Sequence, residues 1–313
     1  MFFYAIRRIL ATIPVMAVVA LFIFSLLYLS PGDPAEIIAG DQARPEDVQR
    51  IRVSLGLNRP FVVQFADWAW RVVHGDLGRS IFTDQPVSHM IGQRIESTLS
   101  LMVLTLALSI MVAVPLGVLA AWKHGTWIDS AVIMLAVLAA SIPVFVIGYV
   151  LAYSFGLELD WFPVQGYTPI SEGVGSWLNN LALPVIALAS AYVALISRIT
   201  RASMLEVLNQ DYIRTAKAKG MGQSPILFIH ALKNAAVPIV TVIGLGVAGL
   251  IGGAVVTESV FAMPGIGRLV ADAILRRDYP VIQGIVLIFS FLYVLVNLAV
   301  DLSYALLDPR IRY

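Results

Sequence analysis

The side chains that could carry out chemistry are few in this sequence and lie far apart. The chain contains no cysteine, which excludes disulfides, thiol catalysis and thiolate metal sites. Its four histidines, His74, His89, His124 and His230, fall in separate polar stretches, so a preformed metal cage is not expected. The sequence patterns of serine hydrolases, zinc proteases and phosphate-binding loops are also missing. We therefore predict that this chain is not an enzyme, holds no cofactor and has no ATP site of its own.

Two acidic residues, Glu258 and Asp301, lie near the ends of long apolar runs. An acidic side chain in a membrane helix is a candidate for relaying protons or ions. Asn297 and Tyr304 share the face of Asp301 at helical spacing, so a stand-alone ion-coupled transporter is one hypothesis. Asp301, however, lies close to the end of its run, where a carboxylate can reach water or an arginine. We therefore favour a structural role for Asp301.

The glycines in residues 244–253 allow two interpretations. Residues 244–249 formally match a dinucleotide-binding fingerprint, but the run is apolar throughout and has no strand–turn–helix unit around it. Gly249 and Gly253 lie four residues apart and form a small-residue stripe that lets another helix approach closely. We predict that this stripe serves helix packing, with a helix of the same chain or of a partner.

The stretch from Asp211 to Pro238 is polar and alanine-rich, and it separates two long apolar runs. Its capping signals predict two short helices joined by a bend. Asp211 is placed to cap the first helix, and Gly220 is placed to end it in the left-handed conformation. Ser224 and Pro225 then predict the N-cap and first turn of the second helix.

The first of these short helices would present one narrow face. Ile213, Ala216 and Gly220 are spaced three and four residues apart, and basic side chains surround them. Such a face can enter a groove on another protein. The alternative is an ordinary basic loop that only fixes the orientation of the chain in a membrane.

The composition places these features in a membrane protein. Hydrophobic residues make up 59% of the 313 residues and charged residues only 13%, far outside the range of soluble domains. Pro115, Pro143 and Pro184 lie within apolar runs and should kink them or open them locally. We predict an all-α integral membrane protein with six transmembrane helices. The expected spans are residues 9–29, 98–121, 131–155, 181–197, 235–257 and 281–302.

A long polar segment separates the first span from the others. Residues 30–97 carry nine acidic and seven basic side chains, and they contain helix starts at Pro45 and Pro60. We expect a small helical segment lying on the outer membrane surface. The predicted organisation is a first transmembrane helix at 1–29, an extracytoplasmic helical segment at 30–97, and a five-helix core at 98–313 that includes a cytoplasmic loop at 198–234.

The orientation follows from lysine and arginine in the short connections. Eleven of these residues fall in the segments proposed to lie inside and three in those proposed to lie outside, which places both termini in the cytoplasm. Tryptophan is enriched at membrane interfaces. All six tryptophans fall outside the expected hydrocarbon spans, as an interfacial belt requires: Trp68, Trp70, Trp122, Trp127, Trp161 and Trp177.

The polar loop also resembles a known family. Aligned on Gly220, Ala216 and Leu232 match the cytoplasmic Glu-Ala-Ala loop of ATP-binding-cassette importer permeases, although the glutamate is absent. The segments 212–220 and 230–238 are similar to the form of this loop in the first permease subunit of dipeptide, oligopeptide and nickel importers. Further motifs typical of that subfamily occur in order at residues 30–34, 55–60, 75–80, 264–268, 278–280 and 308–310.

The resemblance implies a permease subunit in a bacterial inner membrane that spans it several times and contacts lipid. The implied partners are a second homologous permease subunit, two ATPase subunits and an external binding protein, with no nucleic acid. Peptide is the substrate it favours, with nickel or glutathione as alternatives. The implied binding-protein contacts are Asp76, Arg79, Pro264 and Arg268. The implied ATPase-coupling residues are Ile213, Arg214, Thr215, Ala216, Lys217, Ala218, Lys219 and Gly220.

Overall fold

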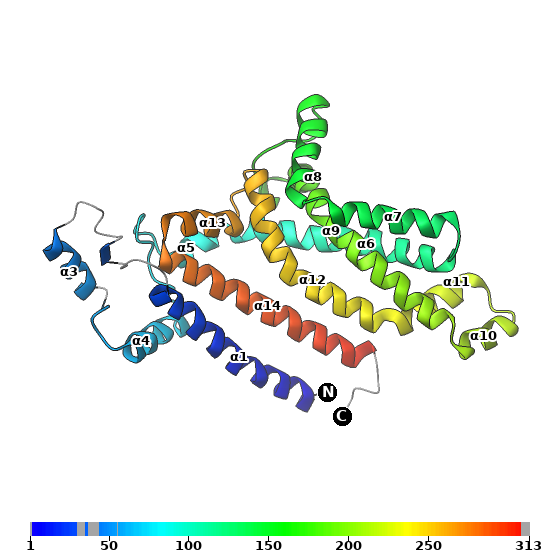
Figure 1. The fold of residues 1–313 in the computed structure, drawn as a ribbon, viewed down its shortest axis with the longest axis horizontal. Coiled ribbons are helices and arrows are strands. Elements are labelled where there is room, and N and C mark those ends of the chain that lie inside the picture. Colours follow the sequence, from blue (N-terminus) through cyan, green and yellow to red (C-terminus); the bar gives the residue numbers. More distant parts are fainter. Residues whose placement is uncertain (1, 30–34, 37–43, 55, 308–313) are drawn as a thin grey trace.

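Figure 1 shows the computed structural model, which describes residues 2–29, 35–36, 44–54 and 56–307. The motifs at 30–34 and 308–310 lie outside these residues. Within the described part, one isolated β-bridge joins Arg79 to Pro86, and helices make up most of the remainder. The prediction of an all-α fold is therefore confirmed.

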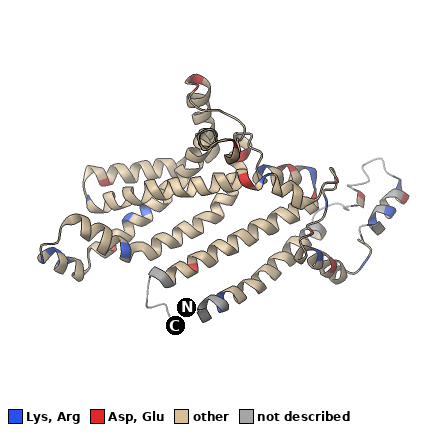
Figure 2. Cartoon of the chain, turned by 180° about the vertical axis from the view of Figure 1, so that it is seen from behind, with Lys and Arg blue, Asp and Glu red and all other residues tan. Residues whose placement is uncertain are grey.

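Five helices are long and apolar enough to cross a membrane, and a pair of helices with a sharp bend between them brings the number to six if the pair counts as one span. They pack side by side in the order α1, α14, α12, α9 and α6, with α7 against α6 and α9 (Figure 1). Figure 2 shows that charged residues gather toward the two ends of these helices, as a bilayer requires. The five single helices are α1 (Phe2–Leu29), α6 (Ile95–Trp122), α9 (Val174–Leu208), α12 (Leu232–Val260) and α14 (Tyr279–Leu307), and the bent pair contains α7 (Trp127–Ser141) and α8 (Val144–Leu151).

The third span differs from the straight helix expected at 131–155. Its two parts, α7 and α8, are bent by 97°, and α8 continues into the π-helix η1 (Ala152–Glu158). Pro143 causes the break, because the residue before a proline is driven out of the helical conformation. Ile142 accordingly has an extended backbone, with φ −94° and ψ 124°. Pro115 and Pro184, in contrast, lie inside uninterrupted helices.

The fourth span is much longer than the expected 181–197. The helix α9 contains 35 residues and is roughly 50 Å long at 1.5 Å per residue, more than the hydrocarbon core of a bilayer. It begins at Val174, next to the 3-10 turn η2 (Ile170–Glu172), and its last turns carry Arg198 and Arg201 at the end that is predicted to be cytoplasmic.

Small residues let α9 pack closely against its neighbours. A Cβ atom on Gly117 of α6 would lie 2.5 Å from Cβ of Thr200. On α12, a Cβ on Gly249 would lie 2.7 Å from the Tyr192 hydroxyl, and one on Gly253 would lie 2.6 Å from Leu188 Cδ1. Tyr192 and Leu188 both belong to α9, so the stripe on α12 faces a helix of the same chain.

Short helices cover both ends of the bundle. The end of the bundle predicted to be cytoplasmic, here called the inner end, carries α10 (Asp211–Ala218), α11 (Gln223–Pro225) and the π-helix η3 (Ile226–Ala231). The start of α1 and the end of α14 lie at the same end of the bundle (Figure 1). The outer end carries α3 (Pro45–Ser54), α4 (Phe61–Val73), α5 (Val87–Gly92) and α13 (Ile266–Arg276).

Candidate coupling site and outer junction

The helix α10 ends in a Schellman motif, which explains its glycine. The backbone N–H of Gly220 donates to the carbonyl of Lys217 at 3.0 Å, and that of Met221 donates to the carbonyl of Ala216 at 3.2 Å. This motif requires a left-handed residue, and Gly220 has φ +77°. The predicted terminator is confirmed.

The start of α10 differs by one residue from the prediction. Gln210, with an extended backbone, occupies the N-cap position, and Asp211 is the first helical residue. The Asp211 carboxylate accepts a hydrogen bond from Arg214 at 3.4 Å instead of capping backbone N–H groups. At this position its negative charge still favours the positive end of the helix dipole.

The apolar face of α10 is turned toward its own chain. Ile213 is fully buried and Ala216 is partly buried, while α10 packs against η3. Ile213 is therefore covered by its own chain in this structure, and its part in coupling to another protein stays a prediction. Sequence periodicity located the apolar face of this helix, but it could not tell which protein covers that face.

The second short helix expected after Ser224 is also corrected. Helical structure runs without interruption from Gln223 to Val260, so α11 and η3 are the inner extension of the fifth span. Gly222, not Ser224, occupies the N-cap position. The π-helical turn of η3 packs Leu227 and Ala231 against a core that includes Val118 of α6 and Met204 of α9. The chain therefore connects α10 to three spans through η3.

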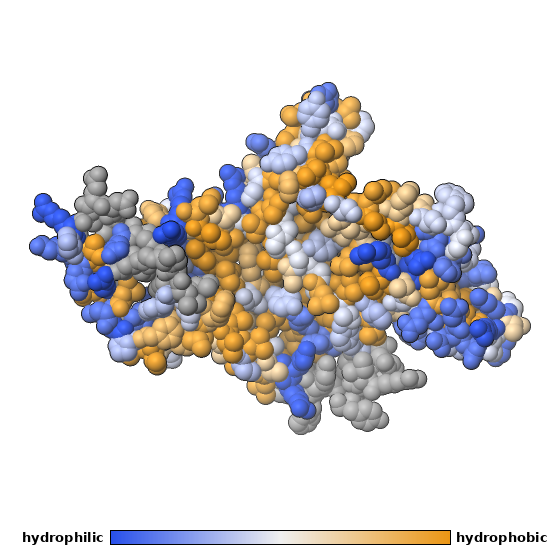
Figure 3. Space-filling view, in the orientation of Figure 1, coloured by the Kyte–Doolittle hydropathy of each residue, from blue (hydrophilic) through white to orange (hydrophobic). Residues whose placement is uncertain are grey.

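The outward surface of this loop is both basic and apolar. Arg214, Lys217 and Lys219 are exposed, and Figure 3 shows a hydrophilic surface over this end of the molecule. Four large apolar side chains are exposed beside these basic residues. Sequence reasoning missed them, because their exposure depends on how η3 and α10 pack: Tyr212, Met221, Phe228 and Ile229.

A buried ion pair joins the inner ends of α7 and α9. The guanidinium of Arg201 on α9 donates to both carboxylate oxygens of Asp129 on α7, at 2.5 and 2.8 Å. The same carboxylate contacts His124 Nδ1 at 2.9 Å and accepts from the Gly125 N–H at 3.1 Å. Because Asp129 is buried, these bonds replace its lost hydration and fix the α6–α7 turn against α9.

Asp301 has a structural partner. Its carboxylate forms an ion pair with Arg8, so α14 and α1 are joined at their inner ends. Tyr304, on the same face, donates to Thr241 of α12 at 2.8 Å, and Asn297 donates to the carbonyl of Tyr293 at 3.0 Å. Arg8 is thus the arginine partner that the position of Asp301 in the sequence suggested.

At the outer end, Glu258 organises a buried capping site. Its carboxylate accepts a hydrogen bond from Thr98 of α6 at 2.6 Å and one from the Arg268 N–H at 2.9 Å. Thr98 in turn accepts from the Ile266 N–H at 2.8 Å. Glu258, at the end of α12, thus caps the N-terminus of α13, where the helix dipole favours negative charge.

Two glycines at the start of α13, the N-cap residue Gly265 and the helical residue Gly267, make room for this carboxylate. A Cβ on Gly265 would lie 2.1 Å from Cδ of Glu258, and one on Gly267 would lie 2.7 Å from Cα of Val255. Both positions therefore exclude a side chain. A glutamate followed by two alternating glycines at a helix start is the sequence signal that could have predicted the site.

A second contact holds the turn at residues 75–86 against the same region. The Ser80 hydroxyl donates to Asp278 at 2.5 Å, and the Ile81 N–H donates to the other carboxylate oxygen at 3.2 Å. Leu77 and Val87 pack with Ile266, Val281 and other apolar residues of α13 and α14. We call the assembly of this turn, Glu258, Thr98 and α13 the outer junction.

The four residues expected to contact a binding protein all lie on exposed positions of the outer junction. Asp76 accepts from the Gly78 N–H at 2.9 Å within its turn, and Arg79 pairs with Asp84 at 2.9 Å. Pro264 and Arg268 are exposed at the start of α13. Their exposure makes them accessible, and their contact with a partner stays a prediction.

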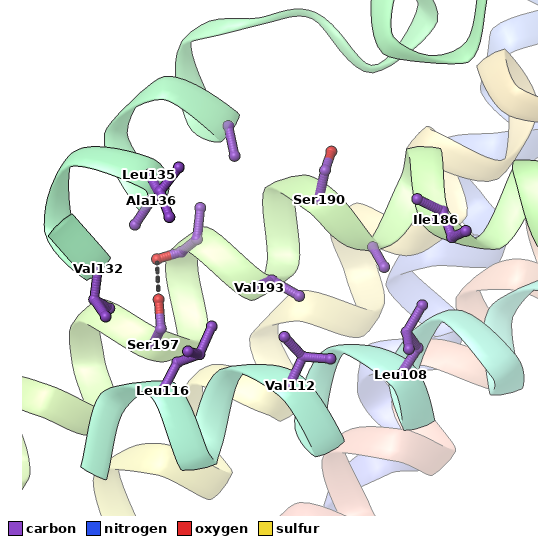
Figure 4. Close-up of a pocket in the computed structure, with 13 residues that line it drawn as sticks. Leu108, Val112, Leu116, Val132, Leu135, Ala136, Ile186, Ser190, Val193 and Ser197 are labelled. Carbon is purple, nitrogen blue, oxygen red and sulfur yellow. Dashed lines mark hydrogen bonds between the residues drawn. The ribbon is translucent and has the colours of Figure 1, made fainter. Parts of the chain in front are cut away.

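An apolar groove of about 380 Å³ opens between α6, α7 and α9 (Figure 4). Its lining includes Leu108, Val112, Val132 and Ile186, with two serines. The Ser190 and Ser197 hydroxyls donate to carbonyls of their own helix, at 2.8 and 3.3 Å. The groove therefore offers surface for apolar contact and few polar groups for orienting a ligand. Among the described residues, no acidic or histidine cluster could hold a metal ion.

The sequence matches two family profiles. Residues 113–313 match the binding-protein-dependent transport system inner membrane component, and residues 1–102 match the N-terminal membrane component of binding-protein-dependent transport systems. Together the two matches cover both the transmembrane core and the outer segment after α1.

The chain is also similar to individual transport proteins, among them two relatives and one protein with a solved structure. It is 56% identical over 310 residues to a protein of Sinorhizobium fredii named probable peptide ABC transporter permease protein, with 99% of each chain covered. It is 39% identical to a glutathione transport system permease protein of Salmonella choleraesuis, again over 99% of each chain. Its fold is similar to a chain of the MetNI methionine ABC transporter, with TM-score 0.58, 16% identity, and 70% of this chain and 96% of that chain covered.

Proposed function

The chain belongs to the family of binding-protein-dependent transport system inner membrane components, and on that premise we propose that it imports peptides with ATP hydrolysed by separate subunits. As a member of this family it is a multi-pass inner-membrane permease subunit. Its family works with ATPase and substrate-binding partners. We propose that the complete complex contains this chain, a second homologous permease subunit, two ATPase subunits and an external binding protein.

The observation that carries the proposal is the construction of α10. Ile213 is buried, α10 packs against η3, and η3 packs into the inner ends of α6 and α9. A force applied to the exposed side of α10 would therefore reach the spans through packed side chains rather than through a loose loop. The exposed basic and apolar residues around α10 are the proposed contact with an ATPase subunit.

The ATPase-coupling residues of the proposal divide into two groups. Ile213 acts as an anchor inside the chain, and Gly220 shapes the end of the helix. The exposed basic residues Arg214, Lys217 and Lys219 contact the ATPase subunit. ATP hydrolysis is assigned to that subunit because this sequence contains no phosphate-binding loop. Nucleotide-driven closure of the ATPases would then bias the spans between inward- and outward-facing states.

Peptide is the proposed substrate because the relative at 56% identity carries a peptide name. Glutathione is a second candidate, supported by the relative at 39% identity, and it is itself a tripeptide. The groove between α6, α7 and α9 has few polar groups, which supports selection by the external binding protein rather than by this chain. The outer junction is the proposed docking place of that protein, through Asp76, Arg79, Pro264 and Arg268.

The test is uptake by proteoliposomes that contain this chain, its second permease subunit and the ATPases, with the binding protein added outside. We expect uptake of a labelled dipeptide that needs ATP and the binding protein, and no uptake of nickel. Labelled glutathione in a parallel assay distinguishes the second candidate. Gradient-driven uptake by vesicles that contain this chain alone would contradict the proposal.

A further inference from the structure

The helix α4 has three faces: one packs against its own chain, one is exposed and apolar, and one is exposed and charged. Its packed face lies against the outer end of α1, where the rings of Phe61 and Trp68 are each 5.4 Å from the ring of Phe24. Tyr28 of α1 also donates a hydrogen bond to Gln64. These contacts hold α4 beside α1 at the level of Phe24 and Tyr28.

The remaining surface of α4 is divided by polarity. At 3.6 residues per turn, one exposed arc is entirely apolar. In it Val62, Trp70 and Val73 are 73%, 68% and 80% exposed. The neighbouring exposed arc carries Asp67 and Arg71. The full apolar arc consists of Val62, Val63, Ala66, Trp70 and Val73.

The position of α4 determines which medium meets each arc. The apolar run of α1 continues to Leu29 and is followed in the sequence by Ser30, Pro31 and Gly32, so Phe24 and Tyr28 lie in the last two turns of this run. The exposed apolar surface of α1 reaches this level through Val18 and Phe22. The apolar arc of α4 therefore lies beside the outer end of a helix with an exposed apolar surface, close to the depth at which tryptophan is enriched in membrane proteins.

We propose that α4 is an interfacial helix of the outer leaflet, with its apolar arc among the acyl chains of phospholipids and its charged arc in water. The packed, apolar and charged faces then meet protein, lipid and water respectively, as an in-plane amphipathic helix requires. The helix would fix the depth and tilt of α1, because a span is positioned by its interfacial anchors.

The absence of cysteine from the chain makes the test direct. Single cysteines replace Val62 or Val73 on the apolar arc, and Asp67→Cys on the charged arc is the matched control on the same helix. Each variant is labelled with a nitroxide and assembled with its partner subunits in phospholipid nanodiscs. Collision rates are measured with oxygen, which concentrates in lipid, and with a water-soluble nickel chelate.

We expect the oxygen-to-nickel accessibility ratio to be several-fold higher at positions 62 and 73 than at position 67. A higher nickel accessibility at both apolar positions would overturn the proposal, since it would place the arc in water. Exclusion of both reagents would also overturn it, since a protein subunit would then cover the arc. Quenching of Trp70 by brominated lipids, compared with Trp70→Phe, gives an independent measurement on a complex without labels, and absence of a Trp70-dependent quenched component would contradict the proposal.

Discussion

Single residues hold the two ends of this permease subunit, and Glu258 is the clearest case. Its buried carboxylate satisfies Thr98 and the first N–H groups of α13 at once. Burial of an acid is costly unless hydrogen bonds replace its water. This residue therefore connects α6, α12 and α13 through a single side chain.

Replacement of Glu258 tests this role. Glu258→Ala leaves several buried polar groups without their acceptor, each at a cost of about 1–3 kcal/mol. We expect a clearly lower midpoint of thermal unfolding for the purified complex. Glu258→Gln, which keeps the shape and one acceptor oxygen, should lower it less. An unchanged midpoint for Glu258→Ala would show that the capping bonds contribute nothing to stability.

Asp301 permits a sharp choice between a relay and a structural ion pair. Arg8 is half-exposed but the Asp301 side chain is only 16% exposed, so removal of one partner should cost about 1–3 kcal/mol of stability. A purely structural pair can be lost at this cost without stopping transport. We expect Asp301→Asn and Arg8→Ala complexes to import substrate with ATP at rates close to wild type. Both variants are measured in the same proteoliposome uptake assay. Loss of uptake in Asp301→Asn with retention in Arg8→Ala would instead support an ion relay.

At the scale of elements, α10 depends on the left-handed residue that ends it. Gly220→Ala should cost about 1 kcal/mol because an L side chain is strained there. Gly220→Pro also removes the N–H that bonds to Lys217. We expect reduced coupling in the first variant and loss of uptake in the second, with ATP hydrolysis retained but no longer stimulated by substrate.

Gly222→Ala is the matched control for this series. Gly222 lies two residues away with φ −66°, and an added Cβ would meet only Cδ of Pro225 at 3.8 Å. Its uptake should equal that of wild type. Ala216→Trp, on the partly buried side of α10, should uncouple like Gly220→Pro. Normal uptake by both Gly220→Pro and Ala216→Trp would reduce the loop to a connector that only sets orientation.

The elements also show how far sequence reasoning reaches. Local signals predicted the end of α10 at Gly220 and a disturbance at Pro143, because capping and proline effects act within a few residues. The 97° bend and the burial of Ile213 depend on packing against distant helices. Glu258 could be placed at the end of a span, but its partner Thr98 is 160 residues away in sequence.

At the scale of the whole molecule, the sites form two organised ends joined by long helices. The inner end carries α10, the Asp129–Arg201 pair and the Arg8–Asp301 pair, and the outer end carries the outer junction. Motifs that are far apart in sequence, at residues 75–80, 264–268 and 278–280, meet in the outer junction. This arrangement suits a subunit that passes a movement from one membrane face to the other.

Contact between an ATPase subunit and α10 can be measured by site-specific photo-cross-linking. Lys217→Cys carries a benzophenone label in the complete complex, and Gln165→Cys in the outer loop after η1 is the control. We expect an ATP-sensitive adduct with an ATPase subunit from position 217 and none from position 165. A transporting complex that gives no ATPase adduct from position 217 would contradict the proposed contact.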